Sequence, residues 1–228
     1  MCFTSKASVS GWWILAFMSL FLWYRNESYD RALAIFVFTL GLIQLIEYGI
    51  HSGADPSQSG RLLYITLWLQ CLVLAIGVFV FIQCDKEHEE ASTKNNLVHS
   101  IAGWNLLLFS IIFIVTLITS FTSGATFSGN VGSSGHIEWY QNGGSILGSY
   151  GWLYLIGIFL PLFLLFSYFA WADIGTAILI LYGILSAVFV LSKYPPAAFT
   201  SLWCYLSVGA AFIMWMIGII PQTNRMCA

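Results

Sequence analysis

The sequence carries too little charge for a protein whose whole surface faces water. Charged residues make up 8% of its 228 residues, and apolar residues make up 59%. Soluble domains carry about 25% charged residues, so most of this surface must face a less polar medium. The formal net charge is -2, and lysine and arginine form no run. The chain therefore lacks the basic surface that nucleic-acid binding needs.

The sequence also lacks the motifs that mark common catalytic and cofactor sites. It has no GxSxG, no HExxH and no phosphate-binding glycine loop. Its five cysteines form no CxxC pair, which argues against a zinc site. The four histidines lie at the ends of apolar segments or between them, which argues against haem. No lysine lies inside an apolar segment, so a retinal Schiff base is not expected. We predict no cofactor and no metal.

Long apolar runs dominate what is present. A membrane-spanning helix needs about 20 mainly apolar residues, and seven such runs predict an all-α, integral membrane seven-helix bundle in one domain. A continuous apolar stretch at 150–192 is divided in two, because one long helix would place Asp173 in the middle of the membrane. The predicted spans cover approximately residues 10–24, 31–51, 61–83, 97–120, 150–169, 173–192 and 198–220.

The segments between the spans predict the orientation of the chain. Residues 121–149 are rich in glycine, serine and threonine and predict a long irregular loop with one ordered core at 136–140. The N-terminal side holds Lys6, Arg61 and Lys193, and the other side holds Arg25, Arg31, Lys86, Lys94 and Arg225. Because positively charged loops favour the cytoplasm, the N-terminus is predicted to be outside or lumenal.

Glu47 is the most informative polar residue, because it is the only acidic residue well inside a predicted span. Gln44, Tyr48 and His51 lie within four residues of it, and at about 100° per residue all four share one broad arc of a helix. Polar groups on one arc of a membrane helix face protein or water. This arc predicts a proton relay, a cation site or the floor of a ligand pocket.

A purely structural interpretation of Glu47 is also open. In it, Glu47 forms an inter-helix hydrogen bond with Gln70 or Tyr64 and only holds the helices together. Further polar positions would converge on the same side of the membrane, in a pocket covered by residues 121–149. The candidates for this pocket are Tyr64, Gln70, Cys204 and Ser207, each of which also suits simple packing. Cys2 is a candidate for acylation, for metal ligation or for reaching back into the pocket, or it packs against the bundle.

The N-terminal octapeptide carries a family resemblance. Residues 1–8 match the pattern Met-Cys-Phe-(Ser/Thr)-x-x-Ala-Ser, and the sequence Gln44-Leu45-Ile46-Glu47 and the pair Trp203-Cys204 match two shorter elements. In these respects the chain resembles a family of uncharacterised multi-spanning membrane proteins seen in bacteria and in large DNA viruses. The resemblance implies that Cys2, Glu47 and Cys204 belong to one shared design. It implies no activity.

Three functions fit the sequence. The first is proton or cation transport, such as an ion channel, in which Glu47 lines a polar path. The second is a sensor or binding module for a lipid or small ligand with aromatic walls. The third is a structural or assembly subunit of a larger membrane complex, or a homo-oligomer. An enzyme with Cys2 or Cys204 as nucleophile is less favoured, because no base is placed near either thiol. The expected partners are membrane lipids.

Overall fold

The described part of the chain contains six α-helices and one small β-sheet. The computed structural model describes residues 4–26, 30–86, 93–132, 137–146, 148–168 and 174–193, together with Gly209. The helices are α1 (Ser5–Arg25), α2 (Asp30–His51), α3 (Pro56–Lys86), α4 (Thr93–Thr122), α5 (Gly151–Tyr168) and α6 (Ile174–Lys193). Each overlaps one of the first six predicted spans, and the division of 150–192 into two helices is confirmed. The seventh predicted span, 198–220, lies outside the described residues apart from Gly209, so a seven-helix bundle is not confirmed.

Local sequence signals start and end these helices. Thr4 precedes α1, and its hydroxyl accepts a hydrogen bond of 3.2 Å from the Ala7 amide, which satisfies one of the free donors of the first turn. Asp55 plays the same part for α3, where its carboxylate accepts from the Ser57 amide at 3.0 Å. Pro56 follows at the first helical position, where its missing N–H costs nothing.

Four of the helices are long and apolar enough to cross a membrane. They are α1, α2, α3 and α4, by their length and composition. Shorter apolar helical stretches follow at Gly151–Leu164 and Leu181–Val190. Large apolar side chains are exposed along these helices, most fully on α1 and α4 (for example Trp13, Phe17 and Leu20; Ile111, Ile114 and Ile118). The chain is thus suited in composition to a membrane.

The prediction of an irregular loop at 121–149 is wrong in part, because the expected ordered core at 136–140 overlaps one strand of a small sheet. The described chain is therefore mostly, but not purely, α-helical. This segment contains three antiparallel strands in the order β1-β2-β3: β1 (Phe127–Val131), β2 (Ile137–Gln141) and β3 (Gly144–Ser145). Asn142 and Gly143 both have positive φ between β2 and β3, as a tight hairpin turn requires. The side chains of Ile137 and Trp139 alternate with exposed or half-buried neighbours and are fully buried. Period-two burial is the reason that this segment is a sheet.

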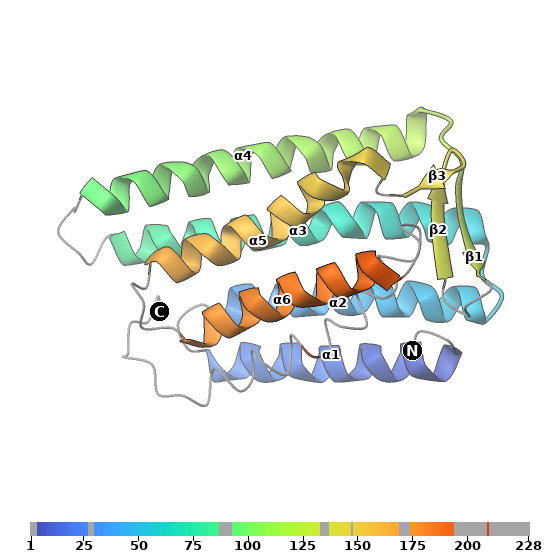
Figure 1. Ribbon diagram of the computed structural model, residues 1–228, viewed down its shortest axis with the longest axis horizontal. Helices are drawn as coiled ribbons and strands as arrows, with labels where there is room; N and C mark the ends of the chain where they lie inside the picture. Colours follow the sequence, from blue (N-terminus) through green and yellow to red (C-terminus); the bar gives the residue numbers. More distant parts are fainter. Residues whose placement is uncertain are drawn as a thin grey trace.

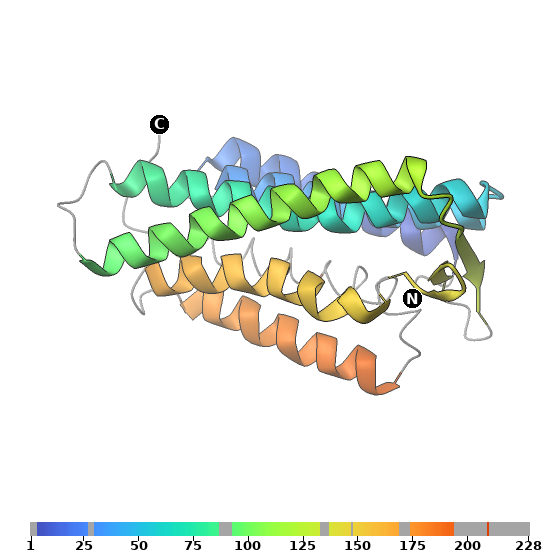
Figure 2. The same ribbon diagram turned by 90° about the horizontal axis from the view of Figure 1, so that it is seen from above.

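The helices lie side by side, with the sheet at one end. Figures 1 and 2 show the helices running along the long axis and the sheet next to the start of α3. Small residues set the closest approaches. A Cβ on Gly77 of α3 would lie 2.4 Å from the Cβ of Ala32 of α2, and a Cβ on Gly60 would lie 3.0 Å from that of Phe127 in β1. Close backbone approach through small residues is the usual packing of membrane helices.

A tyrosine in the sheet makes a testable pH prediction. The Tyr140 hydroxyl donates to the Glu138 carboxylate at 2.5 Å. This hydrogen bond, with smaller contributions from burial and from the carboxylate charge, raises the pKa of Tyr140. The neutral phenol is favoured in the folded protein, so its stabilisation is complete below the ordinary tyrosine pKa of about 10 and is lost as the pH rises through the raised value.

The Glu138→Gln variant should therefore ionise Tyr140 at lower pH than the wild type. The measurement is phenolate absorbance during alkaline titration, with Tyr140→Phe in each background to isolate the contribution of this residue. An unchanged titration midpoint for Tyr140 would show that the Glu138 carboxylate does not stabilise the neutral phenol.

Candidate functional site

The interface between α1 and α2 buries the two central residues of the predicted polar arc. Gln44 and Glu47 are both completely buried. Gly11 on α1 makes room for the Gln44 amide, because a Cβ there would lie 3.1 Å from Gln44 Oε1. We call Gln44, Glu47 and the facing Ser8 the α1–α2 polar site. Removing a carboxyl group from water is costly, so its complete burial on an apolar helix is unusual and favours a functional role.

Ser8 joins this site through the register of the two helices. Gly41 packs against Leu15, since a Cβ on Gly41 would lie 3.3 Å from the Leu15 Cβ, and Gln44 lies beside Gly11. Because α1 and α2 are antiparallel, Ser8 lies about one turn further on, level with Glu47. Ser8 is completely buried, and its hydroxyl has no hydrogen-bond partner among the described residues. A hydroxyl, an amide and a carboxyl group therefore lie along one helix interface.

The rotation of α2 in the bundle buries one side of the predicted arc and leaves the other side exposed. Tyr48 follows Glu47 directly but is 38% exposed, so it lies outside the α1–α2 polar site. His51 is the last residue of α2, and its side chain is half-buried. Of the four residues on the predicted arc, only Gln44 and Glu47 are completely buried. The boundary between the buried and exposed faces passes between Glu47 and Tyr48.

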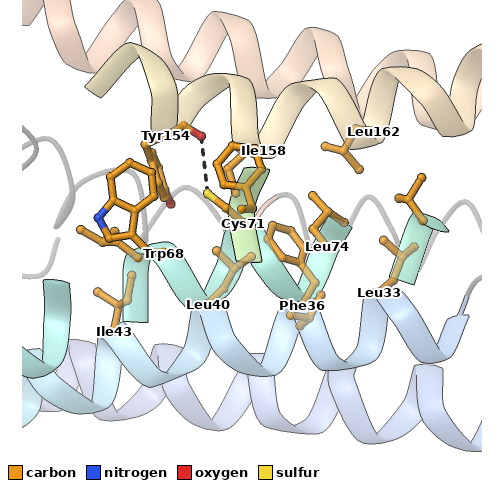
Figure 3. Packing of buried hydrophobic residues seen from close by; sticks show 14 of the residues in the cluster. Leu33, Phe36, Leu40, Ile43, Trp68, Cys71, Leu74, Tyr154, Ile158 and Leu162 are labelled. Carbon is orange, nitrogen blue, oxygen red and sulfur yellow. Dashed lines mark hydrogen bonds between the residues drawn. The ribbon is translucent and has the colours of Figure 1, made fainter. Parts of the chain in front are cut away.

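Gln70 belongs to a different cluster, deeper in the bundle. Its Nε2 donates to the Thr39 carbonyl oxygen on α2 at 3.1 Å, and its Oε1 accepts from the Tyr154 hydroxyl on α5 at 2.7 Å. The Cys71 thiol adds a contact of 3.7 Å to the Tyr154 carbonyl oxygen (Figure 3). Thr39 lies eight residues before Glu47, about 12 Å along the helix axis. Gln70 therefore links α2, α3 and α5, and the suggested bond from Gln70 to Glu47 is not formed.

Tyr64 takes part in an aromatic contact rather than in the polar site. Its ring lies 5.5 Å from that of Phe127 in β1 and 6.5 Å from that of Trp68. Trp68 in turn meets the Tyr154 ring edge-on at 6.4 Å. These rings connect the sheet to the middle of the bundle. At this end of the bundle, β1 of the segment 121–149 thus packs over α3. The predicted pocket beneath it stays a prediction.

Three further candidates lie outside the described residues. They are Cys2, Cys204 and Ser207, and their predicted roles are unchanged. Within the described chain, no three histidine, cysteine, aspartate or glutamate side chains gather in a group suited to a metal ion.

Sequence reasoning did not predict the surroundings of the buried polar residues on the later helices, of which Tyr154 and Asn105 are two examples. Tyr154 is completely buried near the start of α5, and no pattern in the sequence distinguished it from the other tyrosines. Asn105 on α4 is 4% exposed, and its polarity in an apolar run was the only available signal. His99, six residues before it on α4, packs its ring 5.6 Å from that of Phe79. Buried polar groups therefore occur on α1, α2, α3, α4 and α5.

Comparison of the chain with protein-family models, with curated proteins and with solved structures finds no match. The family resemblance of residues 1–8 and its two shorter elements therefore stays a prediction. The function must be argued from the site itself.

Proposed function

We propose that this chain is a multi-pass membrane protein that conducts protons, with Glu47 as the group that takes up and releases them. The observation that supports this most directly is the complete burial of the Glu47 carboxyl group beside Gln44, in helices long and apolar enough to span a membrane. Ionisable residues inside a membrane are costly and usually serve the movement of ions or protons.

Two arginines mark the expected edges of the hydrocarbon layer. Arg31 lies over the Trp23 ring and Arg61 over the Phe121 ring, each at 5.6 Å from the ring centre. Arginine and aromatic residues together are typical of the membrane–water interface. The packing of Gly77 on Ala32 places Arg31 level with the residue after Gly77, which is 17 residues, or about 26 Å, from Arg61 along α3. A hydrocarbon core is about 30 Å thick, so this spacing fits a membrane.

Buried or half-buried polar groups occur at intervals from the level of Arg61 to slightly beyond the level of Arg31. Measured along the helix axis, Glu47 lies near the level of Arg61, Gln44 about 4.5 Å deeper and Gln70 about 7.5 Å deeper again. Asn105 and His99 follow on α4 in two further steps of roughly 8–9 Å. Such steps suit one or two bridging water molecules each. Proton transfer needs only a chain of hydrogen-bonding groups, whereas a metal cation needs several oxygen ligands at one point.

The test is proton flux into liposomes that contain the purified protein. We expect Glu47→Gln to lower the flux at least tenfold while the helical circular dichroism spectrum is unchanged, because the amide cannot exchange a proton as the carboxyl group does. A pH-sensitive dye inside the liposomes gives the rate when a pH gradient is imposed.

Glu138→Gln is the matched control, because it makes the same chemical change in the sheet, outside the proposed spans. It should leave the flux unchanged. Equal flux in wild type and Glu47→Gln would remove Glu47 from the path. No flux in any folded variant would reject conduction and favour ligand binding or assembly into a larger complex.

A further inference from the structure

Pro161 frees a backbone carbonyl in the interior of α5. Proline has no N–H, so the carbonyl oxygen of Gly157, four residues earlier, receives no helical hydrogen bond from position 161. In a membrane, a freed carbonyl must be satisfied by a neighbouring helix, a side chain or a bound water molecule. The surroundings of Gly157 and Pro161 therefore determine what this oxygen binds.

Gly157 faces the junction of α3, α4 and α5. A Cβ on this residue would lie 2.6 Å from both the Cys71 sulfur on α3 and the Phe109 ring on α4. Residues four apart share one face of a helix, so Pro161 faces the same junction as Gly157, and Asn105 the same junction as Phe109. Since α4 and α5 are antiparallel, Asn105 lies level with Pro161.

The Asn105 amide is buried at this level without a partner. Asn105 is 4% exposed, and its Nδ2 has no hydrogen-bond partner among the described residues. By the same register, the residue of α3 at this level is Ala75, which is also buried. Neither Ala75 nor Pro161 has a polar side-chain atom that could meet the amide. A buried donor and a freed acceptor thus lie about one helical turn apart, with no direct bond between them.

We propose that a water molecule bound at the α3–α4–α5 junction bridges the Asn105 amide and the Gly157 carbonyl oxygen. The ligand must accept from an amide N–H and donate to a carbonyl oxygen, and a water molecule does both. It is also neutral, as suits a position whose described neighbours carry no charged side chain. The site requires only that Pro161 and Asn105 lie in apolar surroundings. Its role, a hydrogen-bonding step between the Gln70 cluster and His99, rests on the proposed function.

The sign of one stability change tests the site. With the water in place, Asn105→Leu removes one of its partners and leaves the carbonyl unsatisfied, so the melting temperature in detergent should fall by about 2–4 °C or more. In the Pro161→Ala background the restored backbone N–H satisfies the Gly157 carbonyl, and Asn105→Leu should then raise the melting temperature. If no water is bound, Asn105 is simply an unsatisfied amide, and Asn105→Leu will raise the melting temperature in both backgrounds.

A spectroscopic measurement gives a direct readout. In protein labelled with 15N-asparagine, the side-chain amide signal that is missing from Asn105→Leu belongs to Asn105. In perdeuterated detergent this signal should show magnetisation transfer from water, and the transfer should be lost in Pro161→Ala. A signal without water transfer in the wild type overturns the proposal. Neither measurement uses proton flux, so the site can fail while Glu47 conduction stands, and conduction can fail while the site stands.

Discussion

Gly77→Ala is expected to destabilise the bundle by about 1–3 kcal/mol, the usual cost of overpacking a tightly packed interior. The added methyl group would lie 2.4 Å from the Cβ of Ala32 and 3.2 Å from its Cα. Neither atom belongs to a flexible side chain that could rotate away, so α2 and α3 must separate. The loss should appear as a lower midpoint of thermal or denaturant unfolding in detergent.

Two controls separate the clash from other effects of adding a methyl group. Gly103→Ala makes the same change in the middle of α4, where the nearest atom, on the Phe79 ring, is 3.6 Å away. It should be neutral or stabilising, because alanine favours helix by up to about 1 kcal/mol over glycine. The double variant Ala32→Gly/Gly77→Ala moves the methyl group across the interface and should recover most of the stability. A double variant as unstable as Gly77→Ala alone would show that the contact does not limit the packing.

Tyr154→Ala is the second large expected effect, a loss of about 3–5 kcal/mol. The Tyr154 side chain is completely buried and packs edge-on against Trp68. Its hydroxyl donates a hydrogen bond to Gln70 Oε1. Alanine would leave a cavity between α3 and α5 (Figure 3). Tyr154→Phe keeps the ring and loses only the hydrogen bond, so it should cost about 1 kcal/mol.

The comparison of these two variants separates packing from hydrogen bonding at the centre of the bundle. The exposed Tyr150 is the matched control, because Tyr150→Ala removes the same side chain from a surface position and should change the unfolding midpoint little. Equal losses for Tyr154→Phe and Tyr154→Ala would mean that the bond to Gln70, and not the volume of the ring, dominates. A double-mutant cycle with Gln70→Leu then measures that bond directly.

The helices could be predicted from sequence because apolar runs and their interruptions are local signals. Thr4, Asp55 and Pro56 lie at the boundaries where capping chemistry requires them. The sheet was missed for a different reason. Its strands are short and its composition is that of a loop, so only Asn142-Gly143 and the alternation around Trp139 carried the signal.

The candidate site was only partly predictable. A buried Glu47 follows from the cost of a carboxyl group in hydrocarbon, and burial of Gln44 follows from its position one turn away. The exposure of Tyr48 depends on how α2 is rotated against α1, which no pattern within α2 determines. The hydrogen bond of Gln70 joins it to Tyr154, which is 84 residues away in the chain. Such a pairing depends on the complete fold.

The short connection between α1 and α2 has a consequence for biosynthesis. The chain leaves the ribosome from its N-terminus, and the contacts between these two helices close only a short loop, at low entropic cost. The Arg25–Asp30 ion pair, which joins residues five apart, links the end of α1 to the start of α2. The contact of Gln44 with Gly11 is therefore local, and it can form before contacts between segments far apart in the chain. Glu47, one turn after Gln44, thus lies on a helix whose polar face can be covered early in folding by the preceding helix.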